Sequence, residues 1–246
     1  MKKLDILGVT IDNVSKKESI AEIERAIELN KRIRIITANP EILYRAGYEP
    51  EIRKIINQAD LVLPDGVGIV WAGRKLGTYI QERVTGVDLA VEIMKVGNEK
   101  GWKLFLLGAA PGVAEGAAIR QQREFPKVKF GWNDGYFSKS EEVSVIKKIA
   151  DFNPDILFVG LGAPAQEYWL TENSGLARVS MGVGGTIDVL AGKVKRAPKW
   201  IQSVGIEWLY RLIKEPTRLK RQKVLPFYVM EVLKQKKRLE GRKPNK

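Results

Sequence analysis

Residues 155–167 read DILFVGLGAPAQE, a stretch that contains a complete strand, a loop and the start of a helix. The apolar run at 155–160 is short and continuous, which is typical of a strand buried on both faces of a parallel sheet. Glycines at 160 and 162 mark the loop, and a helical pattern follows at 164–171. A strand–loop–helix unit of this kind, if it recurs along the chain, predicts a parallel sheet covered by helices.

The same alternation recurs over some 190 residues. We therefore predict an α/β fold with a Rossmann-like, largely parallel sheet and flanking helices. This body spans residues 1–195, and two halves meeting near residue 100 are compatible with the pattern. The predicted strands are 4–10, 33–37, 60–63, 102–107, 128–131, 155–160 and 179–183. The predicted helices are 15–30, one starting at 39–40, 86–100, 111–125, 139–152 and 164–171.

Polar or glycine-rich loops follow five of the predicted strands. Because the carboxyl ends of parallel strands lie at one edge of a sheet, these loops are expected to meet there. Backbone N–H groups at helix N-termini favour negatively charged ligands. The pattern therefore predicts a site for an anionic, phosphate-bearing ligand. The loops are TANP (37–40), LPDG (63–66), GAAPG (108–112), GLGAPAQE (160–167) and GVGGTID (182–188).

The chain contains no cysteine and no histidine. This excludes disulfides, thiolate zinc sites, cysteine nucleophiles and Ser-His-Asp triads, so a catalytic base is expected to be Asp or Glu, with Lys or Tyr as the alternatives. There is no GxxxxGK[ST] loop and no Asp-x-Asp triplet that would hold a metal on a diphosphate. The GxGxxA loop at 160–165 lacks the acidic residue that a nicotinamide site requires after the next strand. We therefore expect neither a metal nor a cofactor.

Four side chains at the predicted edge are candidates, and each has a simpler interpretation. Asp65 is either a base at the ligand edge or an ordinary β-turn residue before glycine. Thr37 and Asn39 follow the neighbouring strand, where Asn39 also suits the N-cap of a helix. Arg83 is either a clamp for a diphosphate or a solvated surface residue. Local sequence does not decide between these alternatives.

The segment 193–246 carries 17 Lys or Arg residues and 4 Asp or Glu residues, and therefore the entire net charge of +13. Its apolar residues predict one face of a helix, and Pro226 is expected to open a last helix through about residue 238. We predict that residues 196–246 form a basic amphipathic appendage that docks on an anionic membrane. Alternatively, this face packs on the body or on a second subunit. The apolar residues are Trp200, Ile201, Val204, Trp208, Leu209, Leu212 and Ile213.

The longest uncharged stretches are about half the roughly 20 residues that cross a bilayer. The N-terminal residues MKKLDILGVTID lack the apolar core of a signal peptide, because Asp5 interrupts it. We therefore expect a cytoplasmic protein that is peripheral on the inner face of the cell membrane. No RNA- or DNA-binding motif accompanies the basic segment, so a nucleic acid partner is not expected.

Several motifs resemble those of the WecG/TagA/CpsF glycosyltransferase family. They are TANPE (37–41), LPDGVG (63–68), ERVTG (82–86), GLGAPAQE (160–167) and GVGGTIDVLAGKVKRAPKWIQSVGIEWLYRLIKEPTRLKR (182–221). The resemblance extends from about residue 4 to 230 and is strongest to the N-acetylmannosaminyltransferases of wall teichoic acid synthesis. It implies an inverting, β(1→4) transfer from UDP-N-acetylmannosamine to undecaprenyl-diphosphate N-acetylglucosamine.

Other family donors, such as UDP-N-acetylmannosaminuronic acid or UDP-glucose, remain alternatives. Two alternatives of another class are a nucleotide-binding oxidoreductase and a non-enzymatic membrane adaptor. A homo-oligomer in solution is also compatible with the sequence, because Trp208 and Leu212 would suit a partner subunit as well as lipid.

The resemblance also implies roles for individual residues. Asp65 matches the catalytic base, and Arg83 matches a residue near the diphosphate. Thr37 and Asn39 match positions that contact a sugar. The remaining expected substrate contacts are Gln166 and Glu167, the loop glycines Gly108, Gly162, Gly184 and Gly185, and the arginines Arg211, Arg218 and Arg221, which are expected to reach the site from the appendage.

Overall fold

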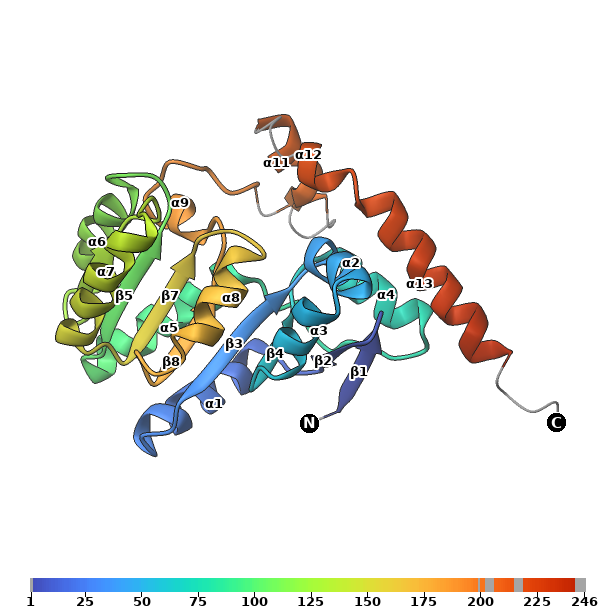
Figure 1. The fold of residues 1–246 in the computed structure, drawn as a ribbon, viewed down its shortest axis with the longest axis horizontal. Coiled ribbons are helices and arrows are strands. Elements are labelled where there is room, and N and C mark those ends of the chain that lie inside the picture. Colours follow the sequence, from blue (N-terminus) through green and yellow to red (C-terminus); the bar gives the residue numbers. More distant parts are fainter. Residues whose placement is uncertain (1, 199, 202–205, 215–218, 242–246) are drawn as a thin grey trace.

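The computed structural model describes residues 2–198, 200–201, 206–214 and 219–241. Its centre is a six-stranded parallel sheet in the order β4-β3-β8-β7-β5-β6 (Figure 1). Strands from both sides of residue 100 form this one sheet, and the predicted α/β class is confirmed. The strands are β3 (Ile33–Ala38), β4 (Leu61–Pro64), β5 (Lys103–Gly108), β6 (Lys129–Asn133), β7 (Ile156–Gly160) and β8 (Val179–Gly182).

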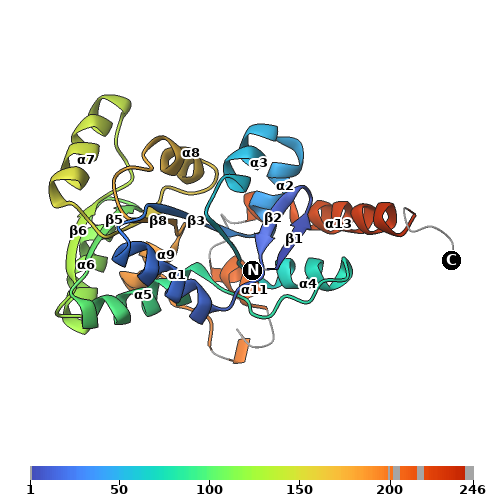
Figure 2. The ribbon, with the colours of Figure 1, turned by 90° about the horizontal axis from the view of Figure 1, so that it is seen from below.

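Helices cover both faces of the sheet, because the central strands are apolar on both sides (Figure 2). One face is covered by α1 (Lys16–Glu28), α5 (Gly86–Lys100), α6 (Val113–Glu124) and α9 (Thr186–Leu190). The other face is covered by α2 (Pro40–Tyr48), α3 (Pro50–Asn57), α7 (Lys139–Phe152) and α8 (Ala165–Glu172). α4 (Val67–Lys75) follows β4 and adds Ile69 and Ala72 to the core cluster around α2 and α3.

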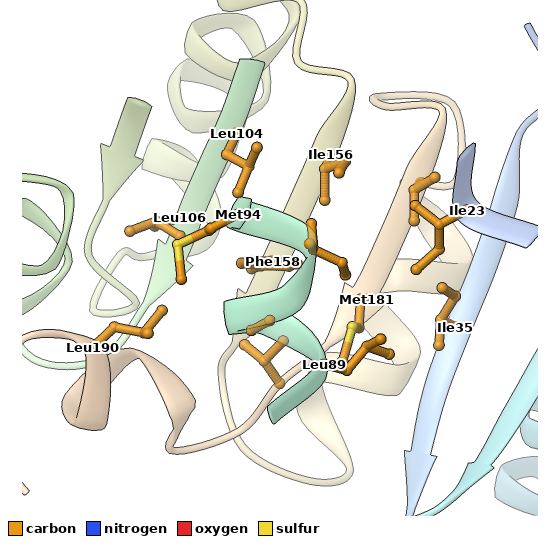
Figure 3. Close-up of a cluster of buried hydrophobic side chains, with 14 of the residues drawn as sticks. Ile23, Ile35, Leu89, Met94, Leu104, Leu106, Ile156, Phe158, Met181 and Leu190 are labelled. Carbon is orange, nitrogen blue, oxygen red and sulfur yellow. The ribbon is translucent and has the colours of Figure 1, made fainter. Parts of the chain in front are cut away.

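The core of the first face shows how strand periodicity directs packing (Figure 3). Leu104 and Leu106 of β5 alternate with residues that face the opposite side, as the two-residue period of a strand requires. They meet Met94 of α5, and Phe158 of β7 joins the same cluster. This packing holds the sheet and α5 together, so the loops at the carboxyl edge begin from fixed strand ends.

Predicted helix boundaries agree best with the structure where local capping signals are strong. The predicted bounds of α5 and α7 match the structure. The capping box at Ser15 and Glu18 opens α1, and the Asn39 side chain accepts the N–H groups of Glu41 and Ile42 at the start of α2. The short α3, α4 and α9 were not predicted.

The predicted single strand at 4–10 is wrong. The chain reverses at Leu7 and Gly8, whose φ angles are 55° and 83°, and it forms a separate antiparallel hairpin. Positive φ at both turn positions gives the tight turn that suits two-residue hairpins. The hairpin strands are β1 (Lys3–Ile6) and β2 (Val9–Asp12).

The described C-terminal elements are α11 (Glu207–Lys214), α12 (Leu219–Gln222) and α13 (Leu225–Glu240). A continuous helix through 200–213 is contradicted, because Ile206 is not helical and α11 begins at Glu207. Val204 lies outside the described residues. The last helix is confirmed, with Pro226 in its first turn.

α13 runs along α2 and α4 (Figure 1). Its Tyr228 and Val232 are buried in the core cluster of the neighbouring body elements. The Tyr228 hydroxyl donates a hydrogen bond to the carbonyl of Gly68 at 3.2 Å, and the Gln235 amide donates to the Asp5 carbonyl at 3.2 Å. One side of α13 is therefore part of the folded body. None of the described helices has both the length and the apolar composition that a bilayer crossing needs.

Candidate active site

A cavity of about 1390 Å³ lies at the carboxyl edge of the sheet. Residues from the loops after β3, β4, β5, β7 and β8 line it, as the strand directions predict. Its other lining comes from the C-terminal elements, including Trp208 and Leu212 of α11 and Tyr228 of α13. The apolar face of α11 therefore turns partly toward the body.

The structure brings most of the predicted site residues together in this cavity. Thr37, Asn39, Asp65, Arg83, Gly162, Gln166, Gly184 and Gly185 all line it. Gly108 and Glu167 do not. Arg218 lies outside the described residues, and so do the side chains of Arg211 and Arg221, whose backbones belong to α11 and α12.

Asp65 lies directly after β4, at the edge of the cavity. Its backbone N–H donates a hydrogen bond to the Ala38 carbonyl at 2.9 Å. Its Oδ2 accepts the backbone N–H of Gly86, the first residue of α5, at 3.4 Å. Gly66 follows with a φ of 95°, a conformation that glycine adopts readily, and α4 begins at the next residue. The carboxylate is therefore held between the loop that joins β4 to α4 and the start of α5.

Thr37 and Asn39 have structural partners as well as positions in the cavity. The Thr37 hydroxyl donates to the Gly182 carbonyl at 3.0 Å, which joins the ends of β3 and β8. Asn39 is the N-cap of α2. The capping interpretation of Asn39 is confirmed, and it is compatible with a contact to a ligand because the residue also lines the cavity.

Gln166 and Glu167 occupy adjacent positions but have different surroundings. The Gln166 side-chain oxygen accepts the Gly184 N–H at 3.0 Å, and its amide donates to Glu167 Oε1 at 2.8 Å. Glu167 is buried beside the cavity and does not line it, so its predicted substrate contact is not supported by the geometry. Burial raises the pKa of the Glu167 carboxyl, although the hydrogen bond from Gln166 acts in the opposite direction.

Gly108 is required for packing at the sheet edge. Its φ is 137°, and a Cβ atom there would lie 2.5 Å from the Gly160 carbonyl oxygen. β5 and β7 approach each other too closely at this point for any side chain. Gly108 does not line the cavity, and its contact with substrate stays a prediction, whereas Gly162 lines the cavity and a Cβ atom added there would have no neighbour within 4 Å.

Arg196 and Glu207 also line the cavity, and sequence reasoning missed both. Arg196 forms a two-point ion pair with Asp88, whose second contact, from Nη2 to Oδ2, is 3.2 Å. Glu207 lies 4.0 Å from Arg83 and 3.9 Å from Arg196. The motif at 182–221 contained Arg196 and Glu207, but nothing in their spacing indicated that they meet.

The charges around Arg196 affect its pKa and that of Asp88. Burial raises the pKa of Asp88, but hydrogen bonds from Arg196 and Thr85 outweigh it, so the net pKa is below the usual value. Burial lowers the pKa of Arg196, but Asp88, Glu207 and Asp65 together raise it above the usual value. Both groups are therefore charged at neutral pH, and the same cavity is lined by a candidate base, Asp65, and by the two arginines Arg83 and Arg196.

Residues 4–242 match the family model described as the glycosyl transferase WecG/TagA/CpsF family. The chain belongs to this family. WecG/TagA/CpsF relatives from Staphylococcus aureus strains MRSA252 and MW2 are each 36% identical over 245 residues, which cover 98% of this chain and 96% of each relative. Both are named N-acetylglucosaminyldiphosphoundecaprenol N-acetyl-beta-D-mannosaminyltransferase. The resemblance seen in the motifs is confirmed, and the oxidoreductase and adaptor alternatives are not favoured.

The cavity is the candidate active site, because residues from all five motifs line it, including more than half of each of the four shorter motifs. Among the residues that the structure describes, no group of three or more His, Cys, Asp or Glu side chains could hold a metal ion. Independence from a metal stays a prediction.

Proposed function

We propose that the protein transfers N-acetylmannosamine from UDP-N-acetylmannosamine to undecaprenyl-diphosphate N-acetylglucosamine. The transfer forms a β(1→4) bond with inversion and serves the linkage unit of wall teichoic acid. The observation that carries this proposal is the meeting of Asp65 with Arg83 and Arg196 in one cavity, in a chain whose relatives are named for this reaction. A carboxylate and two guanidinium groups supply the base and the charge compensation that the transfer requires.

In the proposed mechanism, Asp65 accepts the proton of the acceptor hydroxyl as its oxygen attacks the anomeric carbon. The new carbon–oxygen bond forms on the face opposite the leaving group, which inverts the configuration. The bond to UDP breaks, and its electron pair leaves with the diphosphate. Arg83 and the backbone N–H groups of the loops at 108–112, 160–167 and 182–188 offset the charge that develops there.

The acceptor is a lipid, and the proposal places the protein at the inner face of the membrane. α13 has a side that faces away from the body, where Met230 and Leu233 are exposed. Phe227 is half exposed at the margin of that side, and its ring lies 6.2 Å from the ring of Tyr44 in α2. Lysines at 234 and 237 share that side by helical spacing. Each Lys or Arg near an anionic leaflet contributes about 1 kcal/mol, so this surface is suited to docking. Arg211, Arg218 and Arg221 remain proposed contacts to substrate from the same appendage.

The test is to incubate the full-length protein with a panel of UDP-sugars and a polyprenyl-diphosphate N-acetylglucosamine analogue in anionic vesicles. The product is then identified by mass and linkage. The proposal expects one N-acetylhexosamine added by a β(1→4) bond, only from UDP-N-acetylmannosamine. Transfer from UDP-N-acetylmannosaminuronic acid or UDP-glucose instead would keep the family and change the donor. No transfer from any donor would contradict the proposal.

A further inference from the structure

One carboxylate spans the two guanidinium groups of the cavity. Glu207 Oε2 lies 4.0 Å from Arg83 Nη2, and Glu207 Oε1 lies 3.9 Å from Arg196 Nε. All three residues line the cavity, although they come from three separate parts of the chain. The side chains of both arginines are 22% exposed and that of Glu207 is 11% exposed, so solvent screens this contact less than it screens a surface pair.

The distances show a loose contact for this chemistry. Charge-assisted N–H···O bonds between a guanidinium and an oxyanion are typically about 2.7–2.9 Å long. An anion with more charge and more oxygens would therefore bind this pair of guanidinium groups better than the Glu207 carboxylate does. Arginine forks match phosphate geometry particularly well. Because a single carboxylate reaches both guanidinium groups, their spacing also suits a bridging phosphate group.

Asp88 orients one member of the pair. It engages Nη1 and Nη2 of Arg196, which places Nε toward Glu207. Asp88 is itself held by the Thr85 hydroxyl at 2.6 Å, at the start of α5. The carboxylates that face Arg196 are thus Asp88 from α5, Glu207 from α11 and Asp65 after β4. Asp88 belongs to the rigid body, whereas Glu207 belongs to the appendage.

We propose that Arg196 and Arg83 together bind the diphosphate of a nucleoside-diphosphate donor, and that Glu207 occupies this pair in the unliganded protein and is displaced when the donor binds. This inference rests on the proposed function, because it assigns the donor's charged group to a part of the same cavity. It adds Arg196 to the donor-binding residues. It also couples donor binding to the position of α11, since the displaced carboxylate is the first residue of that helix.

The test is the affinity of the full-length protein for UDP, measured by titration calorimetry without acceptor or vesicles. Glu207→Gln removes the competing charge and keeps the size of the side chain, so UDP should bind about three- to tenfold more tightly. Arg196→Gln should weaken binding by about tenfold or more. In the Arg196→Gln background, Glu207→Gln should increase the affinity for UDP by a smaller factor, because one of the two guanidinium groups is missing. Glu231→Gln is the matched control, because it removes an appendage carboxylate that pairs with Lys234 outside the cavity.

The outcomes separate this inference from the proposed function. Equal or weaker UDP binding by Glu207→Gln, with Glu231→Gln unchanged, would overturn the displacement. A lower melting temperature of Glu207→Gln without tighter binding would overturn it too, and would show that Glu207 only stabilises α11. Unchanged UDP binding by Arg196→Gln would show that Arg196 does not bind the diphosphate. Absence of UDP binding by the wild-type protein would instead contradict the proposed function itself.

Discussion

The side chain of Gln166 holds the backbone of Gly184, because its oxygen accepts the Gly184 N–H at 3.0 Å. This bond joins the first turn of α8 to the loop after β8, and both line the cavity. Glu167 orients the Gln166 amide by accepting its N–H at 2.8 Å. Gly184 has a φ of 51°, so the bond stabilises a turn in the less common left-handed region. The loop expected under UDP therefore depends on a buried side chain for its shape.

Replacing Gln166 with Ala should weaken donor binding without direct loss of a catalytic group. The Gly184 N–H and the Glu167 carboxyl lose their partner, which costs about 1–3 kcal/mol of the free energy of unfolding. The displaced loop should also raise the KM for the donor on the order of tenfold.

Gln121→Ala is the matched control for this variant. Gln121 is equally buried and donates to the Leu190 carbonyl at 2.9 Å, but it does not line the cavity. It should lose similar stability by chemical denaturation and keep the donor KM. A raised KM in both variants would show that the effect of Gln166 is general destabilisation.

Glu167→Gln should change how stability depends on pH. Burial raises the pKa of the Glu167 carboxyl in the folded protein. Its contribution to the free energy of unfolding is therefore fully present below the unfolded pKa of about 4.3 and is lost as pH rises through the folded pKa. Glutamine does not titrate and can still accept the Gln166 N–H. As pH is raised from about 4.5 to about 8, the variant should therefore become more stable than wild type, as measured by denaturant unfolding.

Glu141→Gln provides a control of opposite sign. Hydrogen bonds from the Ser138 backbone and side chain lower the pKa of Glu141, so its contribution is present above the unfolded pKa and is lost as pH falls. This variant should lose stability relative to wild type at pH 8. If the two variants showed the same pH trend, the assignment of a raised pKa to Glu167 would be wrong.

Asp65→Asn should reduce turnover by about 10²–10⁴-fold, because a general base contributes on this scale. The amide keeps the shape of the side chain, so the melting temperature and UDP binding should not fall. Single-turnover transfer with the polyprenyl acceptor measures the loss. Asp188→Asn is the comparison, because Asp188 is another carboxylate that lines the cavity. Near-normal turnover by Asp65→Asn together with loss in Asp188→Asn would move the base to Asp188.

The local sequence was sufficient to predict the six central strands and the helices that have clear capping residues. Continuous apolar runs specify buried strands, and Ser15 with Glu18 specifies a helix start within four residues. The hairpin was missed because residues 4–10 are compatible with one strand or two. Only the positive φ of Leu7 and Gly8 distinguishes them, and a leucine in that region is uncommon.

The site was predictable to the extent that it depends on strand direction. Five loops meet at one edge because the strands are parallel, and this brings Asp65 to Thr37 and Gln166 in one cavity. Glycine identity does not distinguish a residue that faces a ligand from one that permits close backbone packing, and the packing requirement at Gly108 was therefore not predicted. The contact of Arg83 with Glu207 depends on how the appendage folds back, which no local pattern specifies.

Changing the outward side of α13 should remove membrane binding while leaving the fold intact. Met230 is 50% exposed, whereas Tyr228 is 1% exposed because it packs in the body core. The double substitution Met230→Gln and Leu233→Gln should reduce sedimentation with anionic vesicles at least tenfold, since each inserted apolar side chain contributes about 1.5–3 kcal/mol. Phe227 is kept because its ring contacts Tyr44 of α2. Tyr228→Ala should instead cost about 3 kcal/mol of stability, because it opens a cavity under the helix. Deletion of residues from 196 onward would not separate these two effects, because it would remove the docking side of α13 and its core packing together. Wild-type sedimentation by a folded double variant would show that α13 does not dock on lipid.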